Sequence, residues 1–134
     1  MNLADVMQQI ADQADTSVGL QCFPYPPDKI VPPTFEVGLP APINFDEEYD
    51  EGSDAWIFAA TVWVGRKQDR SSVANISPYV ARSGDQSIKA VLQSGTYTAF
   101  ETLHIPSVEF VIAPIAGIEY LGAQFTIEIT GPGG

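Results

Sequence analysis

The sequence predicts an α+β fold: a single mostly antiparallel or mixed sheet with helices packed on one face. Three observations support this class, namely a helical periodicity at the N-terminus, alternating apolar patterns in the middle and last thirds, and helical patterns between them. A chain of 134 residues fits one domain. We therefore predict one α+β domain over residues 1–130, followed by a flexible tail, "GPGG", at residues 131–134.

The N-terminal segment has the periodicity of an amphipathic helix. Leu3, Val6 and Ile10 recur at helical spacing, with polar side chains on the opposite side. Asn2 is suited to cap the first turn, because its side chain accepts from backbone N–H groups. These features predict a helix over residues 3–15.

The next segment is rich in proline. "LQCF", residues 20–23, is typical of a short strand, and seven prolines then fall within residues 24–42. Proline removes a backbone donor, so we expect this stretch to be extended and to wrap an edge of the sheet. Within it, the alternation in "TFEVGL", residues 34–39, predicts a strand with one buried face.

The middle of the chain contains the most apolar strand pattern. "WIFAATVWVG", residues 56–65, is apolar on both faces, with Trp56 on one and Trp63 on the other. This pattern indicates either a central strand covered on both sides or a strand whose second face is buried by another subunit. Tryptophan can stack on a sugar or a base, but core and interface positions are commoner.

Helical patterns precede the last strands. Residues 69–84 predict a helix with a kink or break at Pro78, and Asp85 is a candidate cap for a short helix over residues 86–94. Residues 107–112 and 121–129 alternate as two strands, and the turn between them predicts an antiparallel hairpin.

The charge balance excludes several classes of partner. Seventeen acidic residues oppose six basic ones, for a net charge of −11, so the chain lacks the basic stripe that neutralises nucleic-acid phosphates. Cys22 is the single cysteine, which rules out an intrachain disulfide and a Cys-rich metal site. Without a membrane-length apolar run or a secretory signal, we expect a soluble protein with no membrane partner.

A dense acidic cluster stands just before the long apolar strand. It does not match the calcium loop of an EF-hand: counting from Asp46 places Glu51 where glycine is required, and counting from Glu47 places Tyr49 at a ligand position. Adjacent acids in a wet loop also keep ordinary pKa values, which does not favour acid–base catalysis. The cluster consists of Asp46, Glu47, Glu48, Asp50, Glu51 and Asp54.

No residue pattern indicates an enzyme. His104 is the single histidine and has no acid or nucleophile at a diagnostic spacing, so we expect a partly buried strand histidine. Cys22 has no basic neighbour and is expected to be an inert core thiol. We therefore predict no catalytic residue, no cofactor and no metal.

Particular sequence words resemble a known family: "YPPDKIVPPTFEVGLP", "NFDEEYDEGSDAWIFAATVWVGRKQDRSS" and "AGIEYLGAQFTIEI". Together they are similar to the tail-terminator, or tail-completion, proteins of long-tailed phages, especially those of actinobacteria. The resemblance implies a small α+β domain assembled as a ring, usually a hexamer, at the head-proximal end of the tail tube. Its partners would be its own copies, the major tail tube protein and the neck or head-completion proteins.

The implied location is the tail–neck junction of the virion, reached after assembly in the host cytoplasm, with DNA passing through the channel without specific binding. The acidic cluster would then face the lumen or an adjoining ring. Two alternatives remain: a neck connector or tube-like protein of the same virion, and an acidic cytoplasmic binding module or small hydrolase. The predicted subunit contacts are Tyr25, Pro26, Pro27, Ile57, Trp63, Arg66 and Lys67.

Overall fold

The computed structural model describes residues 2–16, 20–24, 33–39, 43–45, 53–66, 71–84, 86–115 and 117–132. Helices and strands alternate along the chain in the order helix, four strands, two helices and two strands. The elements are α1 (Leu3–Ala14), β1 (Gln21–Phe23), β2 (Thr34–Val37), β3 (Ile43–Phe45), β4 (Ser53–Arg66), α2 (Ser71–Val80), α3 (Ile88–Gln93), β5 (Thr102–Ile115) and β6 (Ile118–Pro132).

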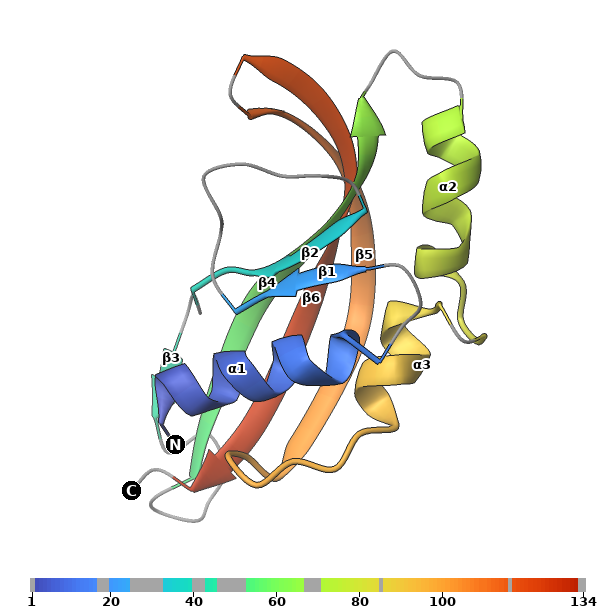
Figure 1. Ribbon diagram of the computed structural model, residues 1–134. Helices are drawn as coiled ribbons and strands as arrows, with labels where there is room; N and C mark the ends of the chain where they lie inside the picture. Colours follow the sequence, from blue (N-terminus) through green and yellow to red (C-terminus); the bar gives the residue numbers. More distant parts are fainter. Residues whose placement is uncertain are drawn as a thin grey trace.

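All six strands belong to one mixed sheet, in the order β1-β2-β4-β6-β5, with β3 pairing a further part of β4 (Figure 1). β1 and β2 are parallel, whereas every other pair is antiparallel. β4 is central, since it pairs with β2, β3 and β6. The predicted α+β class with a single mixed sheet is confirmed.

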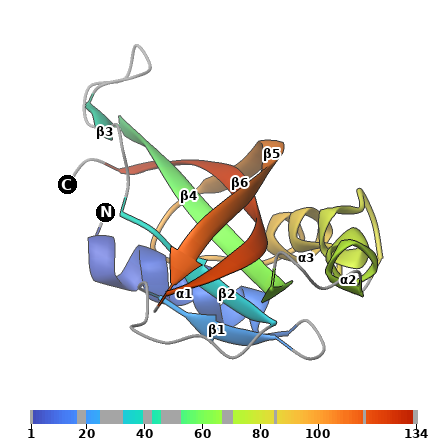
Figure 2. The ribbon, with the colours of Figure 1, turned by 90° about the horizontal axis from the view of Figure 1, so that it is seen from above.

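The core lies between one face of the sheet and the three helices. α1 crosses β1 and β2, while α2 and α3 lie toward β4, β6 and β5 (Figures 1 and 2). The alternation predicted for β4 and β6 places one set of side chains in this core. Fully buried members include Ile10, Phe35, Phe58, Ile88, Leu92, Phe125 and Ile127.

The N-terminal helix forms as the sequence predicts. Asn2 Oδ1 accepts a hydrogen bond from Asp5 N at 3.0 Å, which is the expected N-cap. Further along the helix, Gln9 Oε1 accepts from the backbone N–H groups of Thr98 and Ala99 at 3.0 and 3.1 Å. This glutamine therefore fastens α1 to the segment that leads into β5.

The two later helices differ in detail from the prediction. α2 continues through Pro78 and ends two residues later at Val80, so the expected break at the proline does not occur. α3 begins later than predicted because its cap is Ser87, not Asp85, which lies outside the described residues. Ser87 Oγ accepts from Ala90 N at 3.2 Å.

The last two strands are longer than the patterns suggested. β5 begins at Thr102 rather than at residue 107 because Ile105 and Pro106 form a bulge between His104 and Ser107. Proline is tolerated there, since a bulge at an edge needs no ladder donor. The predicted hairpin is confirmed, with Gly117 in the turn at φ 80°.

Two further corrections concern the strands that pair with the first residues of β4, namely the end of β6 and the short strand β3. β6 continues through Gly131 and Pro132, which pair with Asp54 and Ser53, so these two residues do not belong to a flexible tail. The remaining tail residues lie outside the described ranges. The short strand β3 was not predicted; its three residues form a strand by pairing with Asp54, Ala55 and Trp56 of β4.

Candidate functional site

The second face of the sheet is the most extended functional candidate. None of the described helices packs on it, and alternating residues of the strands point away from the core. We call it the uncovered face, and its members include Glu36 of β2, Ile57, Ala59, Thr61 and Trp63 of β4, Gln124, Thr126 and Glu128 of β6, and His104, Ser107 and Glu109 of β5.

The uncovered face is mostly apolar along its central strand β4, where Thr61 and Trp63 are buried, and its exposed acidic residues lie on β5 and β6. Glu109 and Glu128 are exposed, and Glu109 pairs across the ladder with Gln124. Arg66 is the one Lys or Arg among the described strand residues, and it lies at the far end of β4 opposite Tyr120. Negative charge on this face is therefore not balanced by cations on the same strands.

The carboxyl group of Glu36 lies partly within this face. Burial raises its pKa, and the nearby indole N–H of Trp63 lowers it again in part. That N–H makes no full hydrogen bond within the described part of the chain, so it favours the charged carboxylate only weakly.

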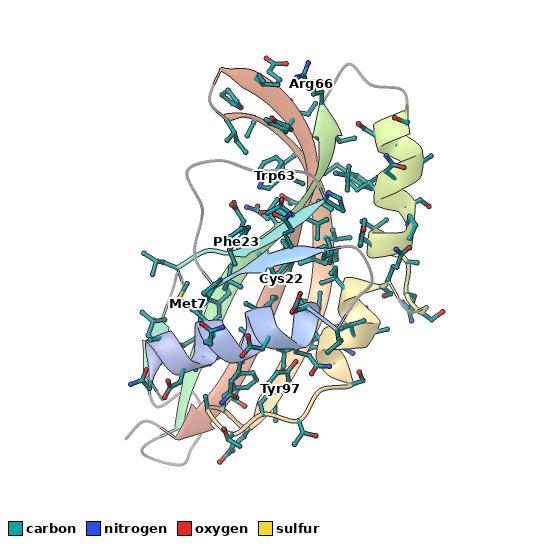
Figure 3. The ribbon with its side chains drawn as sticks, viewed as in Figure 1. Met7, Cys22, Phe23, Trp63, Arg66 and Tyr97 are labelled. Atoms are coloured by element: carbon teal, nitrogen blue, oxygen red, sulfur yellow. The ribbon has the colours of Figure 1, made fainter. Side chains whose placement is uncertain are left out.

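Trp63 was predicted as a subunit contact, but little of its side chain is accessible in a single chain. Figure 3 shows Trp63 on β4; only 5% of its surface is exposed, and its indole packs closely on Gly122 of the neighbouring strand. The chain itself thus buries this side chain without a partner. Trp56 is also buried, in the core beside Phe58, so neither ring is available to stack on a ligand.

The other predicted contacts have different outcomes. Ile57 is half-buried on the uncovered face opposite Glu128, and Arg66 is exposed. Both remain accessible for contact. Tyr25, Pro26, Pro27 and Lys67 lie outside the described residues.

Most of the predicted acidic cluster also falls outside the description. Asp46, Glu47, Glu48, Asp50 and Glu51 are not among the described residues. Asp54 was expected in the loop, but its backbone belongs to β4, where it pairs with Phe45 and Gly131.

The two residues considered for chemistry have unreactive or open surroundings. Burial, followed by the charges of Asp15 and Asp12, raises the pKa of the Cys22 thiol to about 12, which supports the predicted inert thiol. His104 is exposed rather than partly buried; it lies on the edge strand β5, just before the bulge. Over the described residues, no group of three potential metal-binding side chains comes together.

An apolar groove lies on the opposite side of the molecule, between α2 and the β5–β6 hairpin. It has a volume of 320 Å³ and is lined by Val73, Ile76, Val80, Phe110 and Leu121, among others. Phe110 is 62% exposed and Val73 is 68% exposed. Such contiguous exposed apolar side chains are typical of protein–protein contact surfaces.

The acidic residues of the uncovered face were not singled out in the sequence. The alternation of Gly122, Gln124, Thr126 and Glu128 did indicate a polar face on the last strand. The sequence does not state, however, which strands pair, and only the pairing brings Glu109 onto the same surface.

Comparison with protein-family models and with curated proteins gives no match. Of the helices that the structure describes, none has the length and apolar character of a membrane span. The fold and its surfaces are therefore the basis on which function is inferred.

Proposed function

We propose that this chain is a structural, non-catalytic protein of a long-tailed phage virion, the tail terminator. In this role, copies of the chain form a ring, usually a hexamer, at the head-proximal end of the tail tube. The ring ends polymerisation of the tube protein and provides the surface on which the neck and head dock. The sequence words that resemble tail-terminator proteins motivate this proposal.

The observation that carries the proposal is the contrast between the two faces of the sheet. One face is buried under the helices, while the other has no described helix on it and carries the exposed Glu109 and Glu128. A ring that turns this face inward has a negative channel wall. DNA slides along such a wall without sticking, because no counterions are released by contact.

Exposed apolar surface gives separate support for assembly. The groove between α2 and the β5–β6 hairpin exposes Val73 and Phe110, and Ile112 is 52% exposed nearby. A protein that works as a free monomer gains nothing from such a surface, whereas a subunit of a larger assembly buries it.

Deleting the gene tests the role. A terminator mutant produces tail tubes of excess length, visible by negative-stain electron microscopy, and supplying the chain in trans restores normal tails. Tails of normal length beside unjoined heads would instead identify a neck connector. Normal virions from the deletion strain would contradict any structural role.

A further inference from the structure

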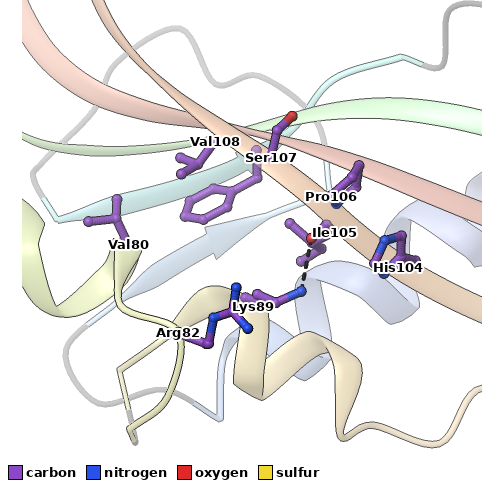
Figure 4. Close-up of a pocket in the computed structure, with 9 residues that line it drawn as sticks. Val80, Arg82, Lys89, His104, Ile105, Pro106, Ser107 and Val108 are labelled. Atoms are coloured by element: carbon purple, nitrogen blue, oxygen red, sulfur yellow. Dashed lines mark hydrogen bonds between the residues drawn. The ribbon is translucent and has the colours of Figure 1, made fainter.

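A second pocket, with a different character, lies between the bulge of β5 and the helices (Figure 4). It has a volume of 470 Å³. Val108 and Phe125 form its apolar part, while Arg82, Lys89 and His104 bring basic groups to it. The described residues that line it include no Asp or Glu.

This concentration of basic groups is unusual for so acidic a chain. The sequence has six Lys and Arg residues and one His against seventeen acids, and three of those seven basic residues line one pocket. Arg82 comes from the segment after α2, Lys89 from α3 and His104 from β5, so three separate elements converge. The pocket is therefore a local positive region on a negative protein.

Lys89 is held in place by the bulge. Its Nζ donates to Ile105 O at 3.0 Å and to Gln93 Oε1 at 2.8 Å. Gln93 Oε1 in turn accepts from Ile105 N at 3.0 Å. Because an ammonium group has three donors, one N–H of Lys89 has no partner among the described residues and can donate to a ligand. An ordered ammonium beside the exposed Arg82 suits a carboxylate.

In the sequence, the acidic segment follows β3, which is the edge strand opposite β5, and precedes the central strand β4. One row of cross-strand partners runs across β3, β4, β6 and β5. Its members, in that order, are Ile43, Trp56, Ile129 and Leu103. β3 and β5 are thus the two edges of this row. Three interstrand spacings separate them, which amounts to about 14 Å. Residues 46–51 join β3 to β4 on one side, and the basic pocket lies beside β5 on the other.

We infer that the basic pocket receives carboxylate side chains from residues 46–51 of a neighbouring copy. This inference rests on the proposed ring. Copies of net charge −11 repel each other at a distance, so close packing needs opposite charges where they touch. Placing an acidic segment at one edge and a basic pocket at the other makes the contact head-to-tail, and head-to-tail contacts close into rings when the rotation permits.

A labelled peptide with the sequence of residues 43–55 tests the contact on the full-length protein. Fluorescence anisotropy at low salt is expected to show binding that weakens as salt is added, because the contact is electrostatic. Arg82→Glu should weaken binding about tenfold, since it replaces attraction by repulsion. Arg82→Lys, which keeps the charge, should retain most of the affinity.

Three outcomes would overturn the inference. The first is no binding of the peptide at low salt. The second is equal weakening by Arg66→Glu, which makes the same change in charge at the far end of β4 and outside the pocket. The third is displacement of the peptide by inorganic phosphate, at matched ionic strength, more readily than by acetate, which would assign the pocket to phosphate.

The ring itself is tested separately by sedimentation of the wild-type chain, alone and with purified tail tubes. Rings that form while the peptide fails to bind would reject the pocket contact and leave the proposed function standing. Peptide binding at the pocket without rings in either condition would reject the ring. The two failures are thus distinguishable.

Discussion

The indole of Trp63 lies so close to Gly122 that a Cβ at position 122 would stand 2.6 Å from Cε3 of the ring. The two residues are direct partners across β4 and β6. Glycine is needed here because its missing side chain leaves the space that the indole fills. This pairing also explains why Trp63 is buried within one chain.

Gly122→Ala should therefore destabilise the fold. We expect the free energy of unfolding to fall by about 1–3 kcal/mol, the usual cost of overpacking a rigid site. Urea denaturation measures the change. Adding Trp63→Phe, which replaces the indole by a smaller ring, to Gly122→Ala should recover part of the lost unfolding free energy. If the effects of the two substitutions on stability simply add in a double-mutant cycle, the contact between these residues is contradicted.

The cap of α3 gives a second test. Ser87 Oγ accepts from Ala90 N and donates to the carbonyl oxygen of Ala81, and the residue is fully buried. Ser87→Ala leaves both backbone groups without this partner, so it should cost about 1–2 kcal/mol of unfolding free energy. Ser94→Ala, at the exposed end of the same helix, is the matched control and should change stability by less than about 0.5 kcal/mol. Equal effects would argue against the cap.

Alkaline pH should destabilise the protein through two partly buried groups, Cys22 and Tyr97. Burial raises the pKa of Cys22 from 9.0 to about 12 and that of Tyr97 from 10.0 to about 12. Both pKa values are higher in the folded state, so the unfolded state loses its protons first. The free energy of unfolding should thus be highest below pH 9.0 and fall as the pH rises toward about 12.

Urea denaturation at a series of alkaline pH values measures this loss. Cys22→Ala removes one of the two groups and should make the decline with pH shallower. A decline of the same steepness in wild type and Cys22→Ala would show that the thiol ionises equally in both states.

The acidic uncovered face predicts an effect on DNA passage. Glu109 and Glu128 are exposed, so replacing both with lysine should change the unfolding free energy by no more than about 1 kcal/mol. Virions carrying the double substitution should release DNA more slowly, because lysines on a channel wall attract phosphates. Release kinetics after receptor triggering measure this effect, with Glu109→Gln plus Glu128→Gln as the milder control. Unchanged release in both would place this face away from the channel.

Local signals account for most of what the sequence predicted correctly. The helical spacing of Leu3, Val6 and Ile10 and the Asn2 cap depend only on nearby residues, and α1 formed as expected. The alternation of residues 56–65 likewise identified a strand, although both of its faces were apolar in the sequence. In both elements, the spacing of apolar residues along the sequence is enough to identify the type of secondary structure.

Features that depend on distant residues could not be predicted in the same way. Asp85 and Ser87 are both suited to cap a helix, and the choice depends on where α3 packs. The predicted strand covered residues 107–112 only, whereas β5 begins at Thr102 and continues through the bulge at Ile105 and Pro106. The basic pocket is lined by both Arg82 and His104, and their arrival at one pocket follows from the tertiary packing of separate elements.

Electron cryo-microscopy of the tail–neck junction in purified virions tests the central proposal most directly. If the chain is the tail terminator, we expect its density in a closed ring on the last layer of the tail tube, with the uncovered face toward the channel. Virions whose junction is fully explained by other proteins, with this chain absent, would contradict it.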